Sequence, residues 1–191
     1  MHQTITASDQ RILTPQQLAA EVRRLTASPA EWVARVRLDP EGRWYEQIHM
    51  GDAYELWLIS WLPGQSTGFH DHGGANGAFG VVWGQLDEYR VTRGGADALP
   101  AGFPATASPP APPAGFPATA RPAGFPATAL PVTAGTVRSF GPRHAHDVRN
   151  AESGSVAVSV HAYSPPLSAM TRYDLTPGGL VPVRTEGSDD W

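Results

Sequence analysis

The sequence contains no cysteine, and this absence excludes several kinds of protein. Without thiols the chain can form no disulfide framework, no thiolate nucleophile and no zinc–thiolate site. No uninterrupted apolar run approaches the length of a membrane-spanning helix. Lys and Arg occur singly or in pairs, and the formal net charge is −4. We therefore expect neither nucleic acid nor an anionic membrane surface as a partner.

The first fifteen residues lack a basic region followed by an apolar one. We therefore expect no signal peptide and a cytoplasmic protein. The 191 residues, of which 41% are apolar, suffice for one domain with a substantial core. We expect a monomer that acts on a small molecule.

Two helices are predicted in an N-terminal segment, residues 1–42. The first covers residues 14–25, where Thr14 and Gln17 match a capping box around Pro15. The second covers residues 28–39 and repeats this arrangement after Ser28. Both helices are interpreted as scaffold.

From Arg43 onward the pattern indicates short strands. A hairpin turned at Gly51 and Asp52 would pair Gln47 with Leu56 and Tyr45 with Leu58. Further strands are expected at residues 78–84, 85–91, 135–140, 155–163 and 179–185. The predicted fold class is mainly β, a small barrel or sandwich over residues 43–185, preceded by the two helices and followed by a tail, 186–191.

An octapeptide, PAGFPATA, interrupts the strands three times, at 100–107, 113–120 and 122–129. Proline removes ladder donors, and Ala, Gly and Thr bury little area. Residues 100–131 are therefore predicted to be a disordered insert between strands. The alternative, a ligand for a proline-recognising partner, is weaker because the segment lacks flanking charges that would fix an orientation.

Histidines occur in three segments that could meet in one β domain. His70 and His72 stand two apart, so on a strand their side chains share a face with Cα atoms roughly 6.5 Å apart. His144 and His146 form a second pair. The combination favours a metal site, although each pair alone is equally compatible with a solvated loop.

Alternation over residues 155–163 puts Ser159, His161 and Tyr163 on one face and the valines on the other. A buried row of this kind needs hydrogen-bond partners for every polar group. It is either a functional row or a satisfied structural network.

Two segments resemble the cupin motifs. The first is Gly64…His70-x-His72…Gly77…Gly84, with Gly77 where a glutamate usually stands, and the second is Gly135…His146-x3-Asn150. The spacing of the second motif selects His146 over His144. Together "FHDHGG", "HDVRN" and "SVHAYSPPL" resemble the cysteine dioxygenase (thiol dioxygenase) family over roughly residues 43–185, without the insert.

The resemblance implies a mononuclear Fe(II) held by His70, His72 and His146, with O2 as co-substrate. The family oxidises a thiol to its sulfinate. Three neutral imidazoles would leave the metal its full charge, which favours an anionic thiolate. Ni(II) in place of Fe(II) remains an alternative, because nitrogen ligands bind Ni(II) more tightly than Fe(II).

The resemblance also implies roles for the other residues. Ser159, His161 and Tyr163 match the outer hydrogen-bonded triad of the family, and the Ser164–Pro165 bond falls where a cis peptide is common. Animal members link a cysteine near the iron to this tyrosine, and Gly77 occupies that position here.

The expected substrate contacts are Tyr45, Gln47 and Arg149. Cysteine-specific members carry an arginine in a Y-x-R stretch that binds the substrate carboxylate, and here Tyr45-Glu46-Gln47 matches it. Arg149 flanks His146, and Arg43 could substitute if the hairpin is shorter. The first hypothesis is dioxygenation of L-cysteine or a close analogue.

Two kinds of alternative stay open. One is an enzyme of different specificity: a 3-mercaptopropionate dioxygenase, as Gln47 suggests, or a nickel-dependent cupin oxygenase that gives another product. The other is a non-catalytic cupin that senses a metal or small ligand, and it leaves the Ser–His–Tyr row unexplained.

Overall fold

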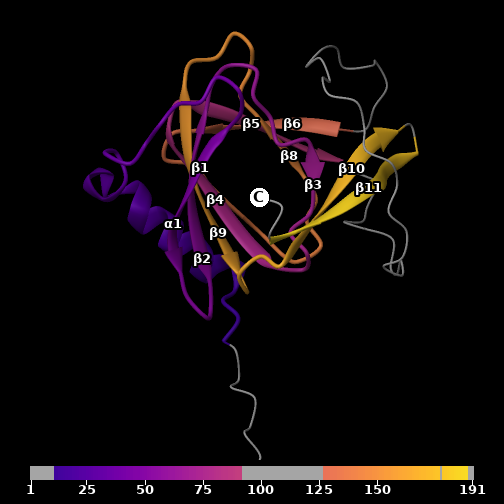
Figure 1. The fold of residues 1–191 in the computed structure, drawn as a ribbon, viewed down its shortest axis with the longest axis horizontal. Coiled ribbons are helices and arrows are strands. Elements are labelled where there is room, and N and C mark those ends of the chain that lie inside the picture. The colour runs from indigo at the N-terminus through magenta and orange to yellow at the C-terminus, as the bar shows by residue number, and fades with distance from the viewer. Residues whose placement is uncertain (1–10, 92–126, 177, 189–191) are drawn as a thin grey trace, which may run out of the picture.

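The computed structural model describes residues 11–91, 127–176 and 178–188. It is mainly β, as predicted (Figure 1). The elements are α1 (Pro15–Thr26), a 3₁₀ turn η1 (Pro29–Glu31), β1 (Trp44–Met50), β2 (Glu55–Trp61), β3 (Phe69–His70), β4 (Asn76–Trp83), β5 (Gln85–Val91), β6 (Ala127–Thr133), β7 (Val137–Phe140), β8 (Asp147–Arg149), β9 (Ala157–Ser164), β10 (Ala169–Thr176) and β11 (Gly179–Gly187). No helix in these ranges is long and apolar enough to cross a membrane.

Three sheets make up the fold, with strand orders β1-β2-β9-β4-β7, β11-β10-β3 and β6-β5-β8. Isolated bridges from Ser66 to Arg149 and from His70 to His146 link the two smaller sheets. Across the described residues the ladders do not close into one continuous barrel. The cupin-like barrel that the sequence predicts is therefore present as an open arrangement of sheets.

The first predicted helix is confirmed. Thr14 caps α1, its side chain accepting from the Gln17 backbone N–H while the Gln17 side chain accepts from the Thr14 N–H. Leu18, Val22 and Leu25 are buried against the five-stranded sheet. The helix therefore closes the outer face of that sheet, as Figure 1 shows.

The prediction of a second helix is wrong. Within residues 28–39 only Pro29–Glu31 are helical, and they form a single 3₁₀ turn. The Ser28 side chain makes no capping hydrogen bond. Trp32 leaves helical geometry, with φ at −131°, and turns inward so that its indole N–H donates to the Leu25 carbonyl. The chain then runs along β2, where Ser60 Oγ donates to the Arg37 carbonyl. Tertiary contacts outweigh a weak local helix preference here.

The predicted hairpin exists, but its register differs by one residue. The turn spans four residues between β1 and β2, and a bulge at Ile48 shifts the ladder. Gln47 therefore lies opposite Trp57, and Tyr45 opposite Ile59. A bulge of this kind cannot be read from an alternating pattern, since it adds one unpaired residue without changing the composition.

The repeat region lies mostly outside the described residues. β6 begins at Ala127, so residues 127–131 of the predicted insert are strand, paired with β5. Pro131 is tolerated because β6 is an edge strand of its sheet. At the other end, β11 continues past residue 185 to Gly187, into the segment predicted as a tail.

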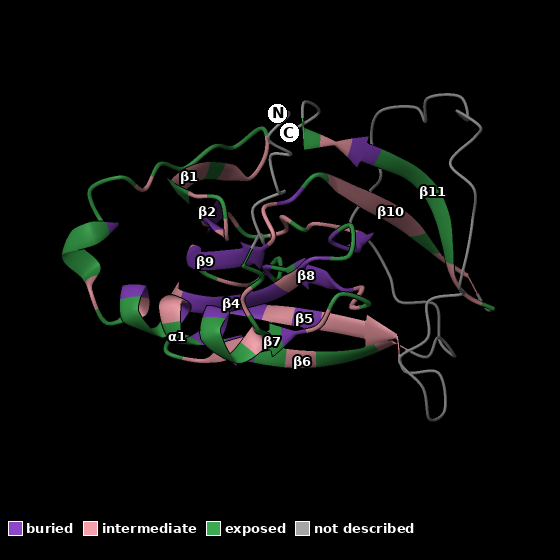
Figure 2. Ribbon diagram, turned by 90° about the horizontal axis from the view of Figure 1, so that it is seen from below, coloured by how far each residue is buried: buried purple, intermediate pink, exposed green. Residues whose placement is uncertain are grey.

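The five-stranded sheet separates two hydrophobic clusters. Val158, Val160 and Ala162 of β9 pack under α1, as the alternation predicts. Ala157 and Tyr163 of the same strand join the second cluster, on the inner face. Figure 2 shows β9 buried along its length, between α1 and the β10–β11 hairpin. The inner face is the one that carries the polar row.

Candidate metal centre

His70 and His146 are fixed as a backbone pair. The His70 N–H donates to the His146 carbonyl over 2.9 Å, and the His146 N–H donates to the His70 carbonyl over 3.0 Å. Residues paired in this way lie directly opposite each other, with both side chains on one face of the ladder. The two imidazole centroids are accordingly 5.0 Å apart.

His72 is held by ring stacking. Its imidazole lies between Phe140, at a centroid distance of 4.7 Å, and Tyr163, at 5.0 Å, with interplanar angles of 28° and 26°. Its Nε2 is buried and has no hydrogen-bond partner among the described residues. An orphaned buried nitrogen of this kind is costly, unless it binds something that the protein itself does not supply.

Asp71, between the two histidines, anchors the segment to β10. Its carboxylate accepts from the backbone N–H groups of Gly73 and Thr171, each over 3.0 Å, and from the Tyr173 hydroxyl over 2.6 Å. Gly73 then turns the chain with φ at 58°, where a Cβ would meet the Ala169 carbonyl oxygen at 2.5 Å. The turn therefore requires glycine.

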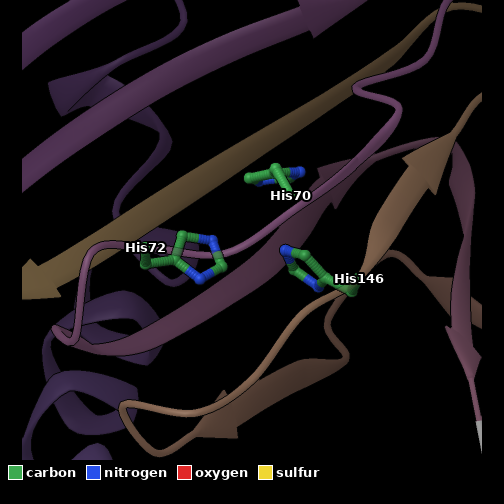
Figure 3. Close-up of side chains that lie close together, drawn as sticks. All are labelled: His70, His72 and His146. Carbon is green, nitrogen blue, oxygen red and sulfur yellow. The ribbon is translucent and has the colours of Figure 1, made fainter. Parts of the chain in front are cut away.

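The three predicted ligands converge, as Figure 3 shows. One ring nitrogen of each lies within 4.8 Å of the others, and all three side chains are buried. His70 Nδ1 lies 3.0 Å from the Gly68 carbonyl, and His146 Nδ1 lies 2.8 Å from Glu88 Oε1. Because these partners only accept, Nδ1 carries the proton in both rings and each Nε2 keeps its lone pair. The donor set fits a metal ion.

The electrostatics also suit metal binding. Burial, together with the neighbouring histidines, lowers the pKa of His70 and His72 well below the ordinary value. Burial lowers the pKa of His146 to about 4, although Glu88 opposes the shift. All three rings are therefore neutral near pH 7, which is the form that ligates a metal.

The predicted Ser–His–Tyr row forms one hydrogen-bonded chain. Ser159 Oγ lies 2.9 Å from His161 Nε2, and His161 Nδ1 lies 3.2 Å from the Tyr163 hydroxyl. Burial lowers the pKa of His161 to about 3, so the ring is neutral and carries one N–H. Burial also raises the pKa of Tyr163, which keeps the phenol protonated. The direction of the chain then depends on which nitrogen of His161 holds the proton.

Trp61 sets that direction. Its indole N–H donates to Ser159 Oγ over 2.8 Å, and an indole cannot accept. The Ser159 hydroxyl hydrogen is then free for His161 Nε2, its other neighbour among the described residues. His161 therefore donates through Nδ1 to Tyr163, whose own hydrogen is left to donate into the cavity.

Replacement of Trp61 by phenylalanine should allow this chain to run in either direction. Ser159 can then also accept from His161 Nε2–H, in which case Tyr163 donates to His161 Nδ1. We expect a mixture of the two His161 tautomers, because one fixed hydrogen bond worth about 1 kcal/mol is lost, with metal affinity unchanged. ¹⁵N NMR of His161 would report the tautomer. The exposed Trp83, changed to phenylalanine, is the matched control. A wild-type His161 that carries its proton on Nε2 would refute the assignment.

A cavity of about 180 Å³ opens beside the cluster. Its wall includes the metal-site residues His70 and His146, the polar side chains of His161 and Tyr163, and a remainder in which apolar and charged side chains are mixed. The other lining residues are Arg43, Tyr45, Trp57, Ile59, Thr67, Val148, Leu167, Met170, Arg172 and Glu186. Of the three predicted substrate contacts, only Tyr45 lies on this wall.

Gln47 and Arg149 do not line the cavity. The Gln47 amide donates to Glu55 over 2.9 Å, toward the turn of the hairpin. Arg149 donates to Asp147 over 2.6 Å and stacks on Tyr89. Alternation explains the second case, because Val148 faces the cavity and its neighbour on β8 must face away.

Two arginines lie on the wall instead. Arg43 precedes β1, and its guanidinium carbon lies 5.3 Å from the centroid of the Trp61 ring. Arg172 lies on β10 directly opposite His70. Its Nε donates to Glu186 over 2.7 Å and its Nη1 to the Thr67 carbonyl over 3.1 Å. The sequence analysis missed Arg172 because β10 was not predicted. It missed Glu186 because that residue lies on β11 just beyond the predicted strand, in the segment predicted as a tail.

A second hollow of about 380 Å³ adjoins the first and shares Arg43, Thr67 and Arg172 with it. Arg184 and Tyr173 also line this outer hollow. Arg184 forms an ion pair with Glu186, which thus lies between two arginines. The inner cavity is therefore electropositive on the side that meets the outer hollow.

A mainly β fold with three inward histidines beside a cavity is the arrangement of a metal-binding cupin. Among known families, Cysteine dioxygenase type I matches residues 8–95 and 128–176, most of the chain. The chain belongs to this family of metal-dependent enzymes. The Ser164–Pro165 bond is cis, as the resemblance predicts.

Solved structures with similar folds share little sequence. The protein TT1209 from Thermus thermophilus is 18% identical, with a TM-score of 0.47, over 70% of this chain and 93% of that one. An RmlC-like cupin protein from Desulfovibrio desulfuricans is 16% identical, with a TM-score of 0.45, over 69% and 91%. No curated protein matches the sequence.

Proposed function

We propose that the protein is a thiol dioxygenase, which converts L-cysteine or a close carboxylate-bearing analogue to the sulfinate with O2 at an iron(II) centre. One observation carries the proposal: one ring nitrogen from each of three histidines converges beside a small cavity that is also lined by two arginines and a tyrosine. His70, His72 and His146 would hold the iron, which would supply adjacent binding positions for thiolate and O2. The overall reaction, RS⁻ with O2 to RSO2⁻, needs no reductant.

The arginines would bind the substrate carboxylate. No hydrogen bond among the described residues engages the Arg43 guanidinium, which leaves its donors available. Burial, with Arg172 nearby, lowers the pKa of Arg43, but a guanidinium keeps its charge at neutral pH. Arg172 faces His70 across the ladder, so a carboxylate on it would lie close to the metal ligands. This arrangement orients the thiol toward the histidine cluster.

Tyr163 would supply a hydrogen-bond donor, and the apolar part of the cavity wall would exclude water. The tyrosine hydroxyl, with its hydrogen directed into the cavity, can donate to the substrate or to developing negative charge. Trp57, Ile59 and Met170 exclude water from the same space. Exclusion of water protects the reacting thiolate from competing oxidations. The size of the cavity suits a small thiol.

A second candidate substrate, 3-mercaptopropionate, is favoured by the charges on the wall. Glu186 is the acidic side chain that lines the inner cavity in the described part of the chain, and it already lies between Arg172 and Arg184. The ammonium group of cysteine would find no unpaired carboxylate there. A thiol without that group avoids the repulsion from two arginines.

The test is O2 consumption by protein loaded anaerobically with Fe(II), with cysteine and 3-mercaptopropionate compared and products identified by mass. We expect uptake of one O2 per thiol and a product heavier by two oxygen atoms. A lower KM for 3-mercaptopropionate would support the second candidate. Replacement of Arg43 by methionine should raise KM for the preferred thiol by one to two orders of magnitude, as a lost charged contact does.

The same assay with Ni(II)-loaded protein tests the nickel alternative. Uptake only with nickel, or a product without two added oxygen atoms, would overturn the iron dioxygenase. No uptake with either metal and either thiol would favour the non-catalytic cupin.

A further inference from the structure

Glu88 of β5 is a fully buried carboxylate directly behind the metal cluster. Its side chain is 0% exposed. Oε1 accepts from His146 Nδ1 over 2.8 Å and from His144 Nε2 over 3.0 Å, while Oε2 accepts from Arg90 Nη2 over 2.7 Å. Three donors from three residues therefore fix one carboxylate.

These contacts determine which ring nitrogen of His146 is protonated and which one faces the other two histidines. An ionised carboxylate only accepts, so the proton of neutral His146 sits on Nδ1 and Nε2 is directed to His70 and His72. The ion pair with Arg90 at 2.7 Å keeps this fully buried carboxylate charged. A charged acceptor on Nδ1 also strengthens Nε2 as a ligand.

We propose that Glu88, clamped by His144 and Arg90, is the positioning residue of the metal ligand His146. The inference rests on the metal site of the proposed function. It gives His144 a role although it is not a ligand: its imidazole stacks on Phe140 at 4.5 Å and keeps Glu88 Oε1 aligned. It also accounts for a carboxylate close to a site whose motif has Gly77 in place of the usual glutamate.

The same residues could be mistaken for a second metal site, since the ligand atoms of Glu88, His144 and His146 lie within 4.8 Å of one another. Their nitrogens, however, already serve as N–H donors to the carboxylate. The proposal therefore requires one metal ion per chain. Two equivalents bound with comparable affinity would overturn it.

The experiment measures metal binding without thiol or O2. Full-length protein is titrated with Co(II) and Fe(II) against a competing chelator, and the Co(II) absorption bands report the coordination. Glu88→Gln keeps the size of the side chain and removes the charge. We expect metal affinity to fall about 10–100-fold, with altered Co(II) bands.

The matched control is Asp87→Asn, the same chemical change on the adjacent, partly exposed residue of β5. It should leave affinity and spectrum unchanged. Equal affinity and spectrum in Glu88→Gln and wild type, with only the apo protein less stable, would reduce Glu88 to a structural residue and overturn the proposal.

His144 supplies variants that keep Glu88 and Arg90 in place. His144→Ala removes one donor, and we expect a smaller loss of affinity, about threefold to tenfold. His144→Gln retains an N–H donor and should recover most of it. If His144→Ala does not weaken metal binding, or if His144→Gln does not restore it, His144 does not help to hold Glu88 in place. If wild type binds metal but oxidises no thiol, the proposed function fails and this inference stands.

Discussion

Gly77→Ala should both destabilise the protein and weaken its metal site. A Cβ at this position would lie 2.1 Å from Phe140 Cε2 and 2.3 Å from Cζ, far inside contact distance. Phe140 cannot retreat freely, since its ring is stacked on His72 at 4.7 Å and on His144 at 4.5 Å. Overpacking of this kind costs about 1–3 kcal/mol. The displaced ring would also push His72 out of line.

Thermal unfolding and Co(II) titration check both effects. Gly141→Ala is the control, because a Cβ there meets nothing within 4 Å. A double variant, Gly77→Ala with Phe140→Leu, should recover part of the stability, since leucine leaves room for the new methyl group. If Gly77→Ala is as stable as wild type, the Phe140 ring can adopt another position and the predicted clash is contradicted. A cysteine at residue 77 would clash with Phe140 in the same way. Residue 77 does lie opposite Tyr163 in the ladder, where animal members of the family have the cysteine that is linked to the tyrosine.

His146→Ala should abolish tight metal binding. It removes one of the three proposed ligands, a larger loss than the 10–100-fold typical of outer contacts, and leaves Glu88 with only His144 and Arg90. We expect less than about a tenth of an equivalent of iron to remain after dialysis, with thiol oxidation lost in parallel. Metal analysis and O2 uptake measure the two.

His49→Ala is the control for this change. His49 stacks on Tyr54, at a centroid distance of 4.5 Å, on the outer hairpin. Its loss should leave metal content intact. Equal loss of metal from His144→Ala and His146→Ala would contradict the ligand set and shift the site toward Glu88.

Strong local patterns are what made part of the fold predictable. The capping box of α1 and the alternation of β9 each place residues by short-range rules, and both are confirmed. The three histidines follow from motif spacing, and in the structure they converge. The polar row could be read for the same reason, because alternation alone puts Ser159, His161 and Tyr163 on one face.

The rest depends on contacts between distant segments. In β10 the residues are half-buried on both faces, so no alternation marks the strand that carries Arg172. Glu88 lies in a predicted strand, but its role becomes visible only when β5 pairs with β8 beside His146. The bulge at Ile48 shifted the register of the hairpin by one residue. Each of these is a tertiary effect that a linear pattern does not contain.

The position of Arg43 and Arg172, between the two hollows, has a kinetic consequence. The protein as a whole carries a net charge of −4 and repels an anionic thiol from a distance. Arg43 and Arg172 would make the local potential positive where the outer hollow meets the inner cavity, and this would draw the anion inward. Salt shortens the reach of such a field, from about 10 Å at 0.1 M to about 3 Å at 1 M.

The rate of substrate capture, kcat/KM, should therefore fall with ionic strength while kcat at saturation stays constant. A parallel decline of both would place the salt effect on the chemistry within the cavity. The effect of the two arginines should therefore be largest at low ionic strength and at thiol concentrations below KM.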